Sequence, residues 1–265
     1  MYLYTYDGTF EGLLTVVFEA YERKAWPVSI ARAYLVQPDM FGESITVVTD
    51  DQKASRVWSG LQKKLSVEAQ QALYYAFLWE QKGYEMLVFD YIKLVFDSPV
   101  SIEGNYAAPC VLQLQQVHKQ VHREKHRMEA FVRFQKTSDG LYFATIAPDF
   151  NVLPIVINHF EKRYADQRWV IYDLHRKYGA YYDLASTLLI DLEETGSKAL
   201  QAVLLGNVLD EEEDKYKQLW QVYFDHVNIP ERKNPKLHQR HMPKRYWKYL
   251  SEKQPKIDLK SERLM

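Results

Sequence analysis

The stretch FVRFQKTSDGLYFATIAPDFNVLPIVINHFEKRYADQRWVIYDLHRKYGAYYD (residues 131–183) places a helical run between two aromatic-rich extended regions. The Asp-Gly pair at 139–140 predicts a β-hairpin in the first region. Helical spacing begins at Asp149 or Asn151, and residues 169–183 predict a second hairpin. This hairpin, helix, hairpin order predicts an α+β class with an antiparallel sheet surrounded by many helices, and it argues against a Rossmann fold.

The flanking sequence is predicted to be largely helical. The first hundred residues show helical periodicity interrupted by two strand-like runs, at 1–6 and 45–49, and a long helix is expected over 111–130. No repeat or low-complexity linker marks a boundary. We therefore expect a single domain over 1–265. The alternative is a subdivision into a mostly helical part, 1–109, and an α+β part with a basic C-terminal segment, 110–265.

Composition excludes several classes of protein. Of 265 residues, 47% are hydrophobic and 26% charged, as in ordinary globular proteins, and no apolar run reaches the roughly 18 residues of a membrane span. The start, MYLYTYDGTFEGLL, lacks the features of a signal peptide, so we expect a cytoplasmic protein without membrane contact. The single cysteine, Cys110, excludes a disulfide framework or a cysteine-ligated cluster within one chain.

The near-neutral net charge of −1 hides a basic C-terminal segment. Residues 231–256 include nine Lys or Arg residues and only two acidic residues. Such cations can neutralise phosphates while interleaved aromatic rings stack on bases. The alternative is a terminal helix whose aromatic residues dock on the body of the protein. The residues predicted to contact nucleic acid here are Arg232, Lys233, Arg240, Lys244, Arg245, Tyr246, Trp247 and Lys248.

A second basic stretch, 118–136, could extend that surface through His126, Arg127 and Arg133. Histidines at 118, 122 and 126 share a helix face, which can form a metal site. However, no carboxylate at a matching spacing completes a ligand set. A solvated basic face is the preferred interpretation, and neither a metal nor a cofactor is predicted.

The sequence contains no recognisable catalytic motif, since the G-x-S-x-G, P-loop and G-x-G-x-x-G patterns are all missing from it. A polar pocket acting on nucleic acid stays open as an alternative, because acids, bases and an anion clamp could converge there. Its candidate members are Asp7, Glu11, His126, His159, Asp173 and Arg176. For His159 a core position is an alternative, and for Asp173 and Arg176 a structural pair.

Four longer stretches carry a resemblance to a known family. They are YDGTFEGLLTVVFEAY (6–21), EKHRMEAFVRF (124–134), the run from Pro148 to Asp183 quoted above, and NIPERKNPKLHQRHMPKRYWKYLSE (228–252). The chain resembles a DNA-metabolism (DNA-repair) family that occurs beside a radical-SAM protein and is sometimes fused to a uracil-DNA-glycosylase-like domain.

The resemblance implies DNA as a partner, single-stranded or duplex. It also implies a radical-SAM protein as a second partner, with a uracil-DNA-glycosylase-like protein as a further candidate. The family carries over no catalytic residue, and the cluster chemistry would belong to the radical-SAM protein. We therefore expect a nucleic-acid-binding accessory protein. The open alternatives are an enzyme on nucleic acid and a protein-binding scaffold without nucleic-acid contact.

Overall fold

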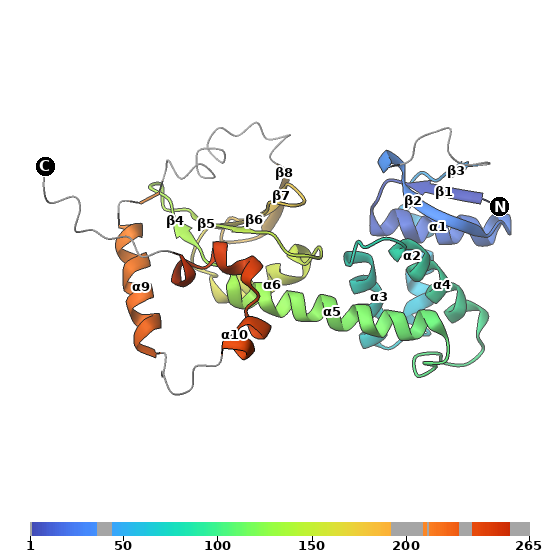
Figure 1. Ribbon diagram of the computed structural model, residues 1–265. Helices are drawn as coiled ribbons and strands as arrows, with labels where there is room; N and C mark the ends of the chain where they lie inside the picture. The colour runs from blue at the N-terminus through green and yellow to red at the C-terminus, as the bar shows by residue number, and fades with distance from the viewer. Residues whose placement is uncertain (1, 36–43, 192–208, 211, 228–234, 255–265) are drawn as a thin grey trace, which may run out of the picture. The chain divides into compact units, whose positions relative to one another are not determined.

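The computed structural model describes residues 2–35, 44–191, 209–210, 212–227 and 235–254 (Figure 1). The chain forms two compact units, residues 1–123 and 124–265. This boundary lies inside the long helix α5 (Pro109–Phe131), whereas the alternative subdivision from sequence places it at the start of that helix.

The first unit contains a three-stranded parallel sheet in the order β2 (Pro27–Arg32), β1 (Tyr2–Tyr6), β3 (Ser44–Thr46). The strand expected at 1–6 is present over the described residues 2–6, and the one expected at 45–49 is shorter and begins one residue earlier. Strand β2 was not predicted. Its pairing with β1 is parallel because α1 (Phe10–Arg23) carries the chain back between them.

Three further helices complete the first unit together with the first part of α5. They are α2 (Asp51–Gln62), α3 (Val67–Leu78) and α4 (Tyr84–Asp97), and the short 3₁₀-helix η1 (Ala33–Leu35) follows β2. Side-chain caps fix the helix starts: Thr9 accepts a hydrogen bond from the Gly12 N–H at 2.9 Å, and Asp50 accepts from the N–H groups of the first turn of α2.

The second unit contains a five-stranded sheet in the order β4 (Gln135–Lys136), β5 (Tyr142–Ile146), β6 (Trp169–Asp173), β7 (Tyr178–Tyr182), β8 (Thr187–Asp191). Helix α6 (Leu153–Arg163) connects β5 to β6, and these two strands pair parallel while all other neighbours pair antiparallel. The α+β class is confirmed. The expectation of a wholly antiparallel sheet is wrong, because α6 acts as a crossover that returns the chain in the same direction.

The core of this unit lies where α6 meets the central strands. All five residues of β6 are buried, and Trp169 stacks on Tyr182 with ring centroids 5.3 Å apart. Phe160 of α6 lies edge-on to Trp169 at 6.3 Å. In the described ranges after the sheet, the chain forms α9 (Glu213–Val227), α10 (Pro235–His241) and the 3₁₀-helices η3 (Lys244–Tyr249) and η4 (Ser251–Lys253). Over the described ranges, no helix combines the length and the apolar character needed to cross a membrane.

Candidate functional site

The basic aromatic run near the C-terminus forms η3, a 3₁₀-helix that begins after Pro243. Side chains three positions apart share a face of a 3₁₀-helix, so Tyr246 lies on a different face from Lys244 and Lys248. Tyr246 is 1% exposed and the following Leu250 is 0% exposed. Lys244 lies over the half-buried Trp247, with its Nζ 5.9 Å from the ring centroid. The docking alternative is therefore right for Tyr246 and Leu250, and base stacking by Tyr246 is ruled out in this structure.

A buried carboxylate on α5 holds Tyr246 in place. Glu124, with 1% of its side chain exposed, accepts a hydrogen bond from the Tyr246 hydroxyl and one of 3.0 Å from the Asp149 N–H. Arg127 and Arg245 each lie 3.4 Å from its other oxygen. Burial, with the hydrogen bond and charge of Glu124, raises the pKa of Tyr246. A buried charge is tolerated here because two cations and two other donors compensate it.

Three of the arginines predicted to bind phosphate are engaged within the protein. Arg245 forms a 2.6 Å ion pair with Asp149 and stacks over the Tyr246 ring at 4.6 Å. Arg127 pairs with Glu124, and Arg133 pairs with Glu252 at 2.8 Å. These pairs position the C-terminal segment within the second unit. Phosphate contact by the three arginines stays a prediction.

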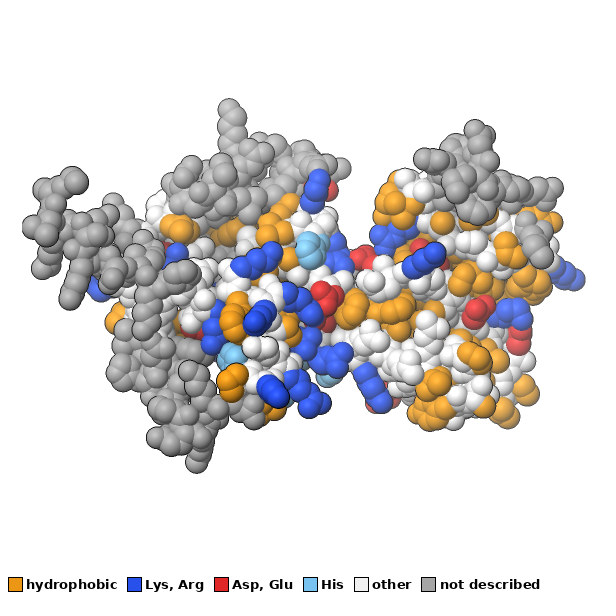
Figure 2. Space-filling view, viewed as in Figure 1, with side chains coloured by type: hydrophobic (Ala, Val, Ile, Leu, Met, Phe, Trp, Pro, Cys, Tyr) orange, Lys and Arg blue, Asp and Glu red, His pale blue; other side chains and the backbone are white. Residues whose placement is uncertain are grey.

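Other cations of the same segment face solvent. Arg240 on α10 and Lys244 and Lys248 on η3 are exposed, and none of the three joins an ion pair within the described part of the chain. Figure 2 shows Lys and Arg side chains gathered over the region of α10 and η3. The half-buried Trp247 lies among them and donates its indole N–H to the Met242 carbonyl oxygen at 3.0 Å. We call Arg240, Lys244, Lys248 and Trp247 the basic surface.

A second polar cluster lies where the parallel strands β5 and β6 end. Asp173, 0% exposed, accepts hydrogen bonds from the His175 N–H at 2.8 Å and from the Arg176 guanidinium at 3.0 Å. The same guanidinium donates to the carbonyl oxygens of Pro148 and Asp149, at 3.3 and 3.4 Å. The pair therefore ties the turn after β6 to the loop after β5, which is the structural role considered from the sequence.

One family matches this chain, over residues 82–252, and it is described only as a domain of unknown function, DUF4130. The chain belongs to the DUF4130 family. No curated protein matches it. The DUF4130 region includes the basic surface, Glu124 and the Asp173–Arg176 pair, and it leaves β1 to α3 outside.

The six residues of the predicted polar pocket divide between the units. Asp7 and Glu11 belong to the first unit and lie outside the DUF4130 region, whereas the other four belong to the second. His126 has a side chain 81% exposed and 3.6 Å from Glu129, and the half-buried His159 packs edge-on to Phe160 at 5.1 Å. Only Asp173 and Arg176 of this set are hydrogen-bonded to each other in the described residues.

Two further predictions concern the segment before α10 and the histidines of α5. Arg232 and Lys233 lie outside the described residues. The rings of His118 and His122 are 6.0 Å apart, and burial, helped by the charges of His122 and Lys119, lowers the pKa of His118. Among the residues that the structure describes, no group of three or more His, Cys, Asp or Glu side chains could hold a metal ion.

The central carboxylate Glu124 was missed by sequence reasoning, although a signal for it exists. It continues the buried stripe of α5 formed by Val111, Leu114, Val117 and Val121 and ending at Met128. A charged residue on an apolar helical stripe requires buried partners. That spacing could have marked Glu124 as a structural node, but it could not have named Tyr246 as its partner.

Proposed function

We propose that this DUF4130 protein binds nucleic acid through its basic surface and acts as an accessory protein in DNA metabolism. One observation carries the proposal: three exposed cations without ion-pair partners in the described residues lie on α10 and the anchored η3, together with the half-buried Trp247. Unpaired cations release counterions when they meet phosphates, and an indole ring offers a face to an unpaired base.

The anchoring of η3 supports a specific geometry for this contact. The buried side chains of Tyr246 and Leu250 anchor the segment, and Arg245 forms ion pairs with Asp149 and Glu124. The backbone that carries the cations is therefore ordered when the protein folds. Less conformational entropy is then lost when nucleic acid binds. Phosphates would meet Arg240, Lys244 and Lys248, and Trp247 is the aromatic member of the basic surface that could stack on a base.

The resemblance to a DNA-repair family supports DNA as the nucleic acid. The single cysteine supports the cytoplasm as the compartment. It also supports a radical-SAM protein as the partner that performs the chemistry, with a uracil-DNA-glycosylase-like protein as a further partner. In this proposal the chain holds the DNA while the partner reacts with it.

The test is binding of the full chain to fluorescein-labelled single-stranded, duplex and uracil-containing DNA, measured by fluorescence anisotropy across a salt series. We expect binding that weakens steeply as salt rises, because phosphate contacts dominate the affinity. Comparison of the three probes identifies the preferred strand form. Absence of binding to every probe at low salt would overturn the proposal and favour the scaffold alternative.

A further inference from the structure

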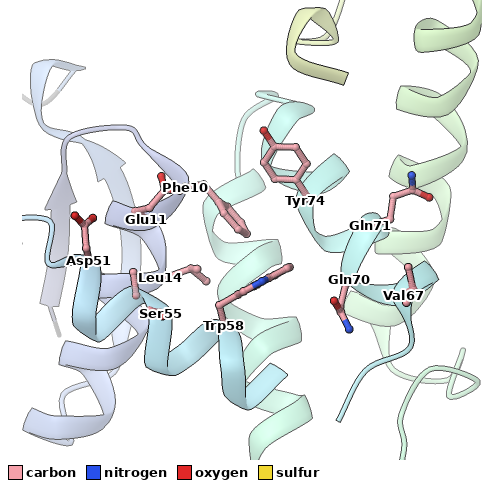
Figure 3. A pocket seen from close by; sticks show the side chains of 11 residues that line it. Phe10, Glu11, Leu14, Asp51, Ser55, Trp58, Val67, Gln70, Gln71 and Tyr74 are labelled. Carbon is pink, nitrogen blue, oxygen red and sulfur yellow. The ribbon is translucent and has the colours of Figure 1, made fainter. Parts of the chain in front are cut away.

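The first unit contains a pocket of about 580 Å³ between α1, α2 and α3 (Figure 3). This volume is within the range of small-molecule binding sites. The pocket lies outside the DUF4130 region and takes no part in the proposed nucleic-acid contact. Its chemistry is set by aromatic and aliphatic walls, two carboxylates and two side-chain amides.

Three aromatic rings form a firm apolar wall. Phe10 on α1 lies edge-on to Trp58 on α2, with centroids 5.7 Å apart, and edge-on to Tyr74 on α3 at 5.3 Å. The buried Leu14 and Ala54 continue this wall. Because each helix contributes a ring that contacts a ring of another helix, the pocket is largely formed before any ligand enters. Such a wall accepts a flat apolar body.

The charge of the lining is negative. Glu11 and Asp51 line the pocket, whereas no Lys or Arg does so, and neither carboxylate has an ion-pair partner in the described residues. Figure 3 shows the two carboxylates at one end of the pocket, on α1 and α2, with Gln70 and Gln71 of α3 at the other. Burial, followed by the charge of Glu11, raises the pKa of Tyr74, so the field of that carboxylate extends along the wall.

The two carboxylates of the pocket come from helices that begin at one end of the sheet. Strand β1 runs into α1 through Asp7, and β3 leads to α2 through Thr49, whose hydroxyl donates to Asp7 at 2.7 Å. Because β1 and β3 pair parallel, their carboxyl ends lie at the same end of the sheet. The N-terminal turns of α1 and α2, with Glu11 and Asp51, begin there.

We propose that this pocket binds a small organic cation whose charged nitrogen group is attached to a flat apolar body. The body lies against Trp58 and Phe10, where a cation also gains from the negative faces of the rings. The charged group faces Glu11 and Asp51. An anion of the same shape is repelled by both carboxylates, since no lining cation compensates them.

The test uses three probes of one shape: benzamidine as the cation, benzamide as its neutral counterpart and benzoate as the anion. Binding is followed on the full chain by ¹H–¹⁵N NMR of the Trp58 indole N–H, which Trp58→Phe identifies by its loss. We expect saturable shifts with benzamidine, at least about threefold weaker binding of benzamide, and no binding of benzoate.

Charge-removing variants distinguish the contribution of the carboxylates to ligand affinity from that of the aromatic wall. Glu11→Gln and Asp51→Asn change exposed side chains, so both variants should fold; each is expected to weaken benzamidine about three- to fivefold and leave benzamide unchanged. The matched control is Glu68→Gln, an exposed glutamate of α3 that does not line the pocket, and it should leave all three affinities unchanged. Equal binding of benzamide and benzamidine, or no shift with benzamidine, would overturn the proposal.

Discussion

The hydroxyl of Tyr246 donates a hydrogen bond to the buried carboxylate of Glu124, which lies 122 positions earlier in the sequence. This contact joins the C-terminal 3₁₀-helix to α5. The same carboxylate also accepts from the Asp149 N–H, so one residue of α5 orders both η3 and the loop after β5. This internal pairing anchors the backbone from which Lys244 and Lys248 extend into solvent.

Removal of the Tyr246 hydroxyl should destabilise the second unit. Tyr246→Phe keeps the buried ring but deprives Glu124 of a donor, and we expect a loss of about 1–2 kcal/mol in the free energy of unfolding. The measurement is urea unfolding followed by the NMR signal of the Trp169 indole, which is buried in the core of this unit.

Tyr249→Phe is the matched control for that change. The Tyr249 hydroxyl is buried and has no hydrogen-bond partner in the described residues, so its removal should cost less than about 0.5 kcal/mol. Equal losses for the two variants would contradict the assigned role of Glu124.

Glu252 should make the stability of the second unit depend on pH on the acid side. Burial alone would raise the pKa of Glu252, but hydrogen bonds from Arg133 at 2.8 Å and Trp220 at 2.9 Å, together with the Arg133 charge, lower it below its usual value. A depressed pKa in the folded state stabilises the fold above the unfolded pKa of about 4.3, and this contribution is lost as pH falls through the folded value.

Glu252→Gln is therefore expected to lower stability at pH 7 and to reduce the further loss between about pH 5 and pH 3. Urea unfolding at a series of pH values measures both effects. Glu68→Gln, at an exposed site, should keep the pH dependence of the parent. A parallel pH profile for Glu252→Gln and the parent would show that the Arg133 pair contributes nothing.

Gly12→Ala should destabilise the first unit although alanine favours helices by about 1 kcal/mol. A Cβ at this position would lie within 3.0 Å of Asp7 Oδ1 and of the Thr49 hydroxyl. Asp7 cannot move freely, because it accepts hydrogen bonds from the Thr9 N–H at 2.9 Å and from the hydroxyls of Thr9 and Thr49 at 2.7 Å each.

We expect a net loss of about 1–3 kcal/mol for Gly12→Ala, measured by urea unfolding followed through the Trp58 indole. The same substitution in an Asp7→Ala background should cost less, since the nearest clashing atom is removed. A stabilised Gly12→Ala variant would show that helix propensity outweighs the Asp7 contacts.

Sequence patterns predicted several strands but not how they pair. The aromatic runs correctly marked β5, β6 and β7, yet periodicity carries no information on strand direction. The parallel pairing of β5 with β6 follows from where α6 returns the chain. Strand β2 was missed because it opens with Pro27 and shows no clear alternation of apolar and polar residues.

The exposed cations of the C-terminal segment were predictable from local composition, whereas the paired arginines were not. Arg245 has the same sequence neighbourhood as Lys244, but its partners, Asp149 and Glu124, lie far away in the sequence. The pocket of the first unit was likewise invisible, because Phe10, Trp58 and Tyr74 meet only after three helices have packed.

The most direct test of the account compares the salt dependence of DNA binding between the parent chain and a variant of the basic surface. The variant combines Arg240→Gln, Lys244→Gln and Lys248→Gln. A control of equal charge change uses three exposed lysines of the first unit that lie outside both basic stretches: Lys24→Gln, Lys63→Gln and Lys82→Gln.

Fluorescence anisotropy with labelled DNA gives the slope of log K against log salt for each protein. We predict that the slope of the basic-surface variant falls in magnitude by about two to three units, since each lost phosphate contact removes about 0.7–0.9, while the control keeps the parent slope. An unchanged slope for the basic-surface variant, or an equal decrease in the control, would contradict nucleic-acid binding through Arg240, Lys244 and Lys248.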